Sequence, residues 1–365
     1  MARTNNFDGL RLLGAMSVVV GHAYHLLGRP EGIPVILGYP LQTLGVIVFF
    51  AISGYLITAS WTRKSNPLTY FAARCLRIFP ALIVVVVLSV VLLGPVTTIL
   101  TTPEYFQNPR TLRYLINIVL QPQYDLPGVF TDLPYPVAVN GSLWTLPAEF
   151  FCYLVVPVLC LVPRKGRFVT VAIFLGVSIH LARVPAIDSP VIWGTRISDA
   201  AGMWVFFAAG ALFRLASEYR RDLFRTDVAI GLVALYACLI GVLPTSVIWV
   251  SWIALPYAVL TIGLASTPYF RRTARFGDLS YGVYLYAFPV QQLVVLYIGV
   301  ERMSLNIALV ASISLALAWV SWHAVEHPSL RLKEAITRRL EPKRRDVRDP
   351  AITPASLDAE AAGRG

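Results

Sequence analysis

Charged residues are scarce in this chain: Asp, Glu, Lys and Arg make up only 14% of its 365 residues, while 56% are hydrophobic. A soluble globular protein carries about a quarter charged residues and under half apolar ones. The shortage of charge therefore argues against a soluble enzyme, although the length alone would fit one of two or three domains. The apolar residues fall in blocks of about 18–22, long enough to cross a hydrocarbon core of about 30 Å.

Three further absences narrow the class of protein. The apolar runs do not alternate with polar residues, which excludes a membrane β-barrel. The first apolar run lacks a small-residue cleavage site, so it does not resemble a cleavable signal peptide. No disulfide or zinc-binding spacing links the four cysteines, Cys75, Cys152, Cys160 and Cys238. The sequence thus predicts an all-α, polytopic integral membrane protein whose main partner is the lipid bilayer.

We expect about ten transmembrane helices, with boundaries good to a few residues. The longest loop, about 101–141, is rich in Pro and Asn and holds one amphipathic stretch, Thr111–Leu120. No internal repeat is evident. Residues 1–335 are predicted to form the membrane domain, and 336–365 a basic, disordered tail. The expected spans are 8–27, 43–61, 79–100, 142–162, 168–182, 198–216, 228–243, 246–266, 280–299 and 305–324.

The excess of basic residues, 31 against 20 acidic ones, predicts the orientation of these spans. In a soluble protein a net charge of +11 would suggest nucleic acid. Here the basic residues lie in short loops between apolar spans, where they set topology, so no nucleic-acid partner is expected. With both termini placed in the cytoplasm, the inner segments hold 23 Lys and Arg residues and the outer segments 6. That asymmetry predicts cytoplasmic termini and an outward-facing 101–141 loop.

The first predicted span carries an unusual row of ionisable residues. Arg11 and His22 are eleven residues apart, which places them on one helix face about 16 Å apart. Asp8 and His25 extend the same stripe by about one turn at either end. Ionisable groups inside a bilayer are costly unless they are paired or lie in a wet cavity, so they are candidate functional residues. The structural alternative is an interfacial Asp8–Arg11 ion pair and a core histidine at position 22.

Two later segments add candidate groups. Arg74 and Arg77 are three residues apart and point the same way on a helix, an arrangement that suits phosphate groups. Ordinary positive-inside charge is the alternative explanation for this pair. Glu149 lies one to two turns inside the outer face, where its carboxylate could orient His22 or bind a sugar hydroxyl. Pairing of Glu149 with Arg113 or Arg196 is the corresponding structural alternative.

The segment His323–His327 fits the H-x-x-E-H pattern of some zinc proteases. We do not predict a metal site there, because the segment ends the last span, Pro328 follows directly, and only Glu334 lies close enough in sequence to be a third ligand. A polar helix end is the simpler interpretation.

Together these segments resemble the acyltransferase type 3 family, bacterial membrane acyltransferases that modify sugars of cell-surface glycans. The resemblance covers roughly residues 5–335. It rests on the Arg11/His22 pair, Phe49–Leu56, Arg74/Arg77, the S-L-W-T-L-x-x-E run ending at Glu149, Leu279–Leu285 and Glu326–Pro328. Two positions depart from the family pattern: Ile47 stands where many members have Asp, and Ala287 lies in the segment where many have His.

The resemblance implies an O-acyltransferase of the bacterial inner membrane that uses cytoplasmic acyl-CoA, such as acetyl-CoA, and has no bound cofactor or metal. The acceptor would be a hydroxyl of an exopolysaccharide, lipopolysaccharide or lipid-linked saccharide. His22 would be the general base, with Glu149 and Arg11 completing the catalytic set. Arg74 and Arg77 would bind the donor. Residues expected to bind the acceptor or to support the site are Asp8, Ser142, Trp144 and Tyr281.

Two other functions fit a polytopic membrane protein. A secondary transporter would also carry intramembrane charge, but it usually has repeated halves and paired broken helices. A non-catalytic membrane component of a glycan export system would explain the spans but not the set of Arg11, His22 and Glu149.

Overall fold

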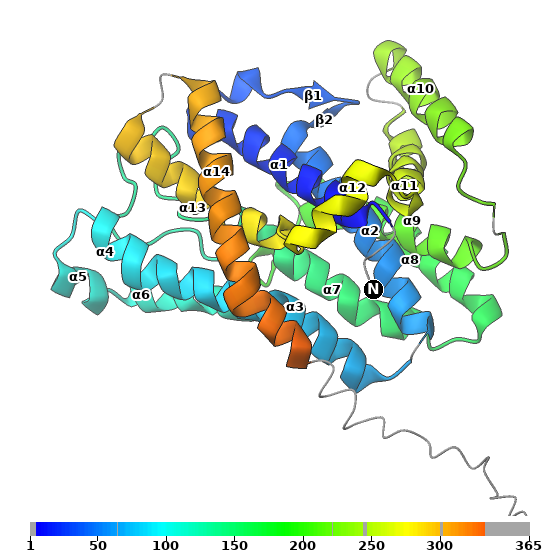
Figure 1. Ribbon diagram of the computed structural model, residues 1–365, viewed down its shortest axis with the longest axis horizontal. Coiled ribbons are helices and arrows are strands. Elements are labelled where there is room, and N and C mark those ends of the chain that lie inside the picture. Colours follow the sequence, from blue (N-terminus) through cyan, green and yellow to red (C-terminus); the bar gives the residue numbers. More distant parts are fainter. Residues whose placement is uncertain (1–4, 64, 221, 244–246, 300–301, 333–365) are drawn as a thin grey trace, which may run out of the picture.

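The computed structural model describes residues 5–332 apart from 64, 221, 244–246 and 300–301. The predicted tail, 336–365, lies outside the described residues. Helices dominate the described chain, and two two-stranded hairpins are its sheets, in agreement with the predicted all-α membrane class. Figure 1 shows the helices packed side by side, with α10 and α11 at one flank and α14 crossing the front of the bundle.

The described helices match nine of the ten predicted spans to within a few residues, and the third span differs. They are α1 (Phe7–Leu26), α2 (Leu41–Arg63), α3 (Pro67–Leu88), α4 (Gly94–Thr97), α5 (Thr102–Gln107), α6 (Pro109–Arg113), α7 (Thr145–Leu159), α8 (Arg167–Ala182), α9 (Ile197–Ala216), α10 (Thr226–Val242), α11 (Ile248–Leu264), α12 (Pro268–Thr273), α13 (Ser280–Ile298) and α14 (Met303–Ser321).

Seven of the described helices are long and apolar enough to cross a membrane. Two others, α10 and α11, are apolar but shorter, and α1 carries Asp8 and Arg11 within its 20 residues. Added to the seven, α1, α10 and α11 would give the ten predicted spans. The exact number of spans stays a prediction.

The third span begins earlier than hydropathy indicated. The helix starts at Pro67, because the Asn66 side chain accepts a hydrogen bond from the Thr69 amide and proline suits the first helical position. A π-helical turn at Ser89–Leu93 joins α3 to α4, so the rod runs from Pro67 to Thr97. Arg74 and Arg77 therefore lie within the same continuous helix as the apolar segment.

The two ends of the bundle differ, and we name them by their residues. At the basic end lie Arg63, Arg164, Lys165 and Arg275, where α2 and α7 finish and α8 and α13 begin. The opposite, hairpin end carries β1 (Val35–Ile36) with β2 (Tyr39–Pro40), and β3 (Val191–Ile192) with β4 (Thr195–Arg196).

The long loop between α4 and α7 lies at the hairpin end. Its predicted amphipathic stretch forms the last part of α6 and a 3-10 helix over Tyr114–Val119. The Gln292 side chain of α13 donates to the carbonyls of Tyr135 and Ala138 and so fixes the end of the loop to the bundle. The loop is thus an ordered cover over this end of the helices.

The fold contains a repeat that the sequence alone did not reveal. In both copies, a helix leads through a β-hairpin into a second helix: α1–β1–β2–α2, and α8–β3–β4–α9. The hairpins share the sequence P-V-I-x-G, at Pro34–Gly38 and Pro190–Gly194. The turn residues have nearly equal φ angles, 51° and 75° in the first hairpin and 52° and 74° in the second. The expectation of no repeat was therefore wrong.

Equivalent residues of the two copies contact each other where α2 crosses α9. A Cβ atom on Gly54 would collide with the Phe207 carbonyl, and one on its equivalent, Gly210, would collide with the Ala51 carbonyl. Ala51 and Phe207 also occupy equivalent positions, so the contact is reciprocal, as around a local two-fold axis. Close approach of this kind requires glycine at both positions.

Replacement of either crossing glycine by alanine should separate α2 from α9. We expect Gly54→Ala and Gly210→Ala each to cost about 1–3 kcal/mol of unfolding free energy, as overpacked cores do. Thermal unfolding of the purified protein in detergent measures this loss. The control is Gly231→Ala on α10, where nothing lies within 4 Å of the added Cβ atom. Equal melting temperatures for all three variants would contradict the close crossing.

Candidate active site

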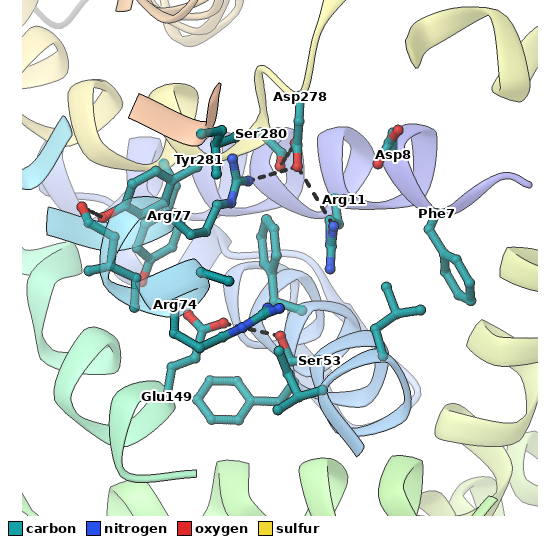
Figure 2. Close-up of a pocket in the computed structure, with 18 of the residues that line it drawn as sticks. Phe7, Asp8, Arg11, Ser53, Arg74, Arg77, Glu149, Asp278, Ser280 and Tyr281 are labelled. Atoms are coloured by element: carbon teal, nitrogen blue, oxygen red, sulfur yellow. Dashed lines mark hydrogen bonds and ion pairs between the residues drawn. The ribbon is translucent and has the colours of Figure 1, made fainter. Parts of the chain in front are cut away.

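A large cavity of about 1420 Å³ opens at the basic end of the bundle. Its lining comes from α1, α2, α3, α7 and α13, and from the segments before α13 and after α14. Figure 2 shows side chains of these elements converging on the cavity. The ionisable residues in the lining are Asp8, Arg11, Arg63, Arg74, Arg77, Glu149, Tyr153, Arg275, Asp278, Tyr281, Tyr284 and His327. Six of the predicted site residues thus line one cavity: Asp8, Arg11, Arg74, Arg77, Glu149 and Tyr281.

Arg77 is held by two carboxylates in one wall of the cavity. Its guanidinium lies 2.7 Å from the Asp278 carboxylate and 3.3 Å from that of Glu326. Arg11 of α1 approaches the same Asp278 oxygen at 3.6 Å, as the dashed lines in Figure 2 show. The Tyr281 ring lies 5.3 Å from the Arg77 guanidinium, and its hydroxyl donates to the Ile78 carbonyl. This charge cluster connects α1, α3, α13 and α14.

Arg74 has different surroundings although it is only one helical turn from Arg77. Its guanidinium carbon lies 5.8 Å from the ring centres of both Tyr70 and Tyr153. Its buried Nε has no hydrogen-bond partner among the described residues. Aromatic faces can stabilise a cation without occupying its N–H donors, so Arg74 keeps donors for a ligand.

Glu149 lies at the same cavity and accepts two hydrogen bonds on one oxygen. Ser53 of α2 donates over 3.0 Å, and Tyr153, one turn further along α7, donates over 2.5 Å. Ser53 belongs to the Phe49–Leu56 run of the family resemblance, and its neighbour Gly54 packs against the Phe207 carbonyl of α9. Ser53 itself contributes a hydroxyl to the site.

His22 lines a second, small cavity of about 60 Å³ nearer the hairpin end. Its ring meets the edge of Phe288 at a centroid distance of 5.4 Å. Gln42 lines the same cavity, and its side-chain nitrogen lies 3.2 Å from Nε2 of His25. The full lining is Val18, His22, Gln42, Thr43, Val46, Trp144, Met203 and Tyr284.

Among the described residues, Glu149 and His22 do not contact each other through a hydrogen bond. The two side chains line different cavities. Their positions in the two spans predict a similar depth, but the direction in which each helix faces depends on packing that the sequence does not reveal. Arg11 and His22 do share α1, one at each cavity.

The remaining predicted residues fall into two groups. Trp144 lines the small cavity, while Ser142 is buried beside it, and its carbonyl accepts a hydrogen bond from the Tyr284 hydroxyl. Asp8 and Tyr281 belong to the large cavity. The two positions that depart from the family pattern, Ile47 and Ala287, are buried in the apolar core. Ala287 directly precedes Phe288, the ring that contacts His22.

Asp278 and Glu326 belong to the site but not to the predicted set of site residues, although Glu326 begins the Glu326–Pro328 run on which the family resemblance partly rests. Glu326 belongs to the His323–His327 segment, which we interpreted as a polar helix end. Its carboxylate binds Arg77 and accepts from Ser321, while His323 contacts the Trp319 carbonyl and His327 stacks on Trp322. One sequence signal could have identified Asp278 and Glu326: each is an acidic residue next to an apolar span, in a chain that has few acidic residues.

Comparisons with known proteins agree with the resemblance in the sequence. Residues 4–323 match the family model described as an acyltransferase domain. The chain is 32% identical over 336 residues to an O-acetyl transferase of Shigella phage Sf6, covering 89% of this chain and 96% of that protein. It is 30% identical over 364 residues to nodulation protein 10 of Rhizobium leguminosarum bv. viciae, covering 92% and 95%. No solved structure matches the chain.

Removing one carboxylate from the charge cluster should destabilise the protein strongly. Loss of one partner from a buried ion pair leaves an uncompensated charge and costs about 3–5 kcal/mol, so we expect that loss for Asp278→Ala. The matched control is Asp227→Ala, because Asp227 pairs with Arg225 on the surface, where an ion pair contributes about 0–1 kcal/mol. Chemical unfolding of both variants checks the difference, and similar stabilities would show that the cluster is not a structural crosslink.

Proposed function

Because the chain belongs to the acyltransferase type 3 family and is an O-acyltransferase, we propose that it moves an acyl group from cytoplasmic acyl-CoA to a glycan hydroxyl. The acyl group is acetyl in this proposal, which the name of the phage relative supports. The acceptor is a cell-surface glycan, exopolysaccharide, lipopolysaccharide or lipid-linked sugar. The observation that carries the proposal is the placement of His22 in a small cavity that adjoins the large, arginine-lined one.

The basic end of the bundle faces the cytoplasm in this proposal. The excess of Lys and Arg in the segments at that end supports the orientation, since positive loops stay on the cytoplasmic side. The protein then lies in the bacterial inner membrane with both termini inside the cell. The large cavity is open to cytoplasmic acyl-CoA, and the small cavity lies toward the outer side, where the acceptor binds.

The donor lies along the large cavity with its phosphates toward the basic end. Arg63 and Arg275 line the cavity and are exposed, which suits them to the nucleotide phosphates. From Arg63 to Ser53, α2 rises about 15 Å, a distance that the extended pantetheine arm can span. Arg74 binds the donor deeper in the cavity. Arg77 contributes by holding the wall, because its guanidinium is already bound to two carboxylates.

The transfer itself takes place beside His22. A ring nitrogen of neutral His22 accepts the proton of the acceptor hydroxyl as its oxygen attacks the thioester carbonyl. The C–S bond then breaks, the acyl group forms an ester with the acceptor, and the CoA thiolate takes up the proton from His22. The roles of Arg11 and Glu149 are to position the donor at the inner side of this step. A direct transfer is the simplest scheme that the two cavities support.

Secondary transport is the alternative function for a protein with cavities toward both ends. The relative named O-acetyl transferase, aligned over 96% of its length, favours the enzyme.

His22→Ala should abolish most of the acyl transfer. A positioned general base contributes about 10²–10⁴-fold to rate, so we expect a loss in that range with acyl-CoA binding kept. The assay follows transfer of labelled acetyl from acetyl-CoA in membranes that contain the acceptor. The control is His25→Ala. His25 lies one turn further along the same helix, where its ring contacts the Gln42 side chain, and its replacement should reduce the transfer rate only slightly. Full activity of the His22 variant together with an inactive His25 variant would show that the base is misassigned.

Replacement of Arg74 should weaken donor binding, whereas replacement of Arg77 should mainly lower stability. Arg74→Ala removes a charge-assisted contact to the donor, worth about 1.5–3 kcal/mol, so acyl-CoA affinity should fall roughly ten- to a hundred-fold while the fold stays intact. Arg74→Lys should recover only part, because an ammonium group cannot bind in a bidentate manner.

Arg77→Ala is the matched comparison, and its main effect should be on thermal stability, because it leaves Asp278 and Glu326 without their shared partner. Isothermal titration with acyl-CoA and thermal unfolding measure the two effects. Normal acyl-CoA binding by Arg74→Ala would contradict the role proposed for that residue.

A further inference from the structure

The two cavities meet at a narrow boundary. Of all their lining residues, only Val46 of α2 and Tyr284 of α13 belong to both. An acyl group that travels from the arginine-lined cavity to His22 must therefore pass these two side chains. This boundary is a separate feature from the donor and base residues described above.

Tyr284 is a fixed wall of the boundary. Its hydroxyl lies 2.8 Å from the Ser142 carbonyl and 2.6 Å from the Thr145 hydroxyl. Its ring meets the edge of Phe49 at a centroid distance of 6.0 Å, and only 7% of the residue is exposed. Because the ring is held at its hydroxyl and packed along its side, it does not yield easily to a larger group.

Val46 and Met203 are further side chains in the lining of the small cavity, and both are apolar. Val46 is 8% exposed and Met203, on α9, is 9% exposed, and both line the small cavity with His22. Neither side chain carries a hydrogen-bonding group, so an acyl chain meets them through packing alone. Selection on such a surface depends on volume.

The small cavity is large enough for only a few heavy atoms. It measures about 60 Å³, and on this scale one water molecule needs roughly 10–15 Å³. The cavity thus holds roughly four to six heavy atoms. An acetyl group and the attacking hydroxyl oxygen, about four heavy atoms together, lie at the lower end of that range. A butyryl group with the same oxygen has about six and reaches the upper end, so each added methylene uses up the remaining space.

We propose that Val46, Met203 and Tyr284 form an acyl subsite that restricts the enzyme to short acyl groups. This inference rests on the proposed function, since it requires an acyl-CoA donor in the large cavity and His22 as the base. It adds that donor selection is made at the boundary between the cavities, by the volume left beside His22. The large cavity, with about 1420 Å³, imposes no comparable limit on the chain.

The test compares acetyl-, propionyl- and butyryl-CoA with the full-length protein in membranes that contain the acceptor. A hydrophobic pocket discriminates by about ten-fold or more for each methylene, so kcat/KM for the native protein should fall at least ten-fold from each donor to the next. Val46→Ala and Met203→Ala should each reduce the preference for acetyl-CoA over butyryl-CoA, measured as the ratio of their kcat/KM values, by about ten-fold, because each clears space beside His22. Val46→Leu narrows the subsite and should lower acetyl transfer as well.

Val250→Ala on α11 is the control for loss of core volume, because Val250 is equally buried at 8% exposure and lines neither cavity. It should keep the native preference. Competition binding of the three donors, measured alongside, reports chain-length preference even where a variant turns over slowly. Unchanged preference in both enlarged variants, by rate and by binding, would overturn the acyl subsite while leaving the acyltransferase intact. A native protein that binds no acyl-CoA of any length would overturn the proposed function and the subsite together.

Discussion

The attraction between Asp278 and the arginines of α1 and α3 is the constraint on which the basic end of the protein depends. Charges removed from water destabilise a fold unless each is paired, and the pairs here come from segments far apart in sequence. Asp278 precedes α13 and is bound by Arg77 and Arg11, while Glu326 at the end of α14 binds Arg77 from the other side. One turn of α3 thus carries two arginines in different states: Arg77 is bound to two carboxylates, while the buried Nε of Arg74 has no hydrogen-bond partner among the described residues.

Helix α1 is the element that relates the two cavities. Arg11 contributes to the large one and His22 to the small one, and about three turns of helix separate them on a single face. A rigid helix holds that separation constant. In the reaction that we propose, the backbone of α1 therefore sets the depth at which the donor thioester must lie.

The sequence predicted what local patterns determine and missed what packing determines. The helices lie within a few residues of their predicted positions, except α3, because the Asn66–Pro67 start carries the helix through the polar segment around Arg74. The face shared by Arg11 and His22 follows from helical periodicity alone. The partners of Glu149 and Arg77 could not be predicted in this way, since Ser53 is 96 residues from Glu149 and Glu326 is 249 residues from Arg77. The repeat escaped notice because its clearest identity is confined to a five-residue hairpin.

The reciprocal crossing of α2 and α9 implies a duplicated unit whose two copies have diverged in opposite directions. At the positions equivalent to Arg11, His22 and Ser53, the second copy carries Arg167, Ser178 and Ala209. Arg167 and Ser178 are turned to backbone carbonyls of their own neighbourhood, those of Val162 and Phe174. The second copy thus carries neither the imidazole of His22 nor the hydroxyl of Ser53, and what the two copies share is the backbone path through the hairpin and the crossing of the second helices. Because that crossing is reciprocal, a side chain added at either glycine displaces the same pair of helices, so the α9 half constrains the position of Ser53 although it holds no equivalent of that residue.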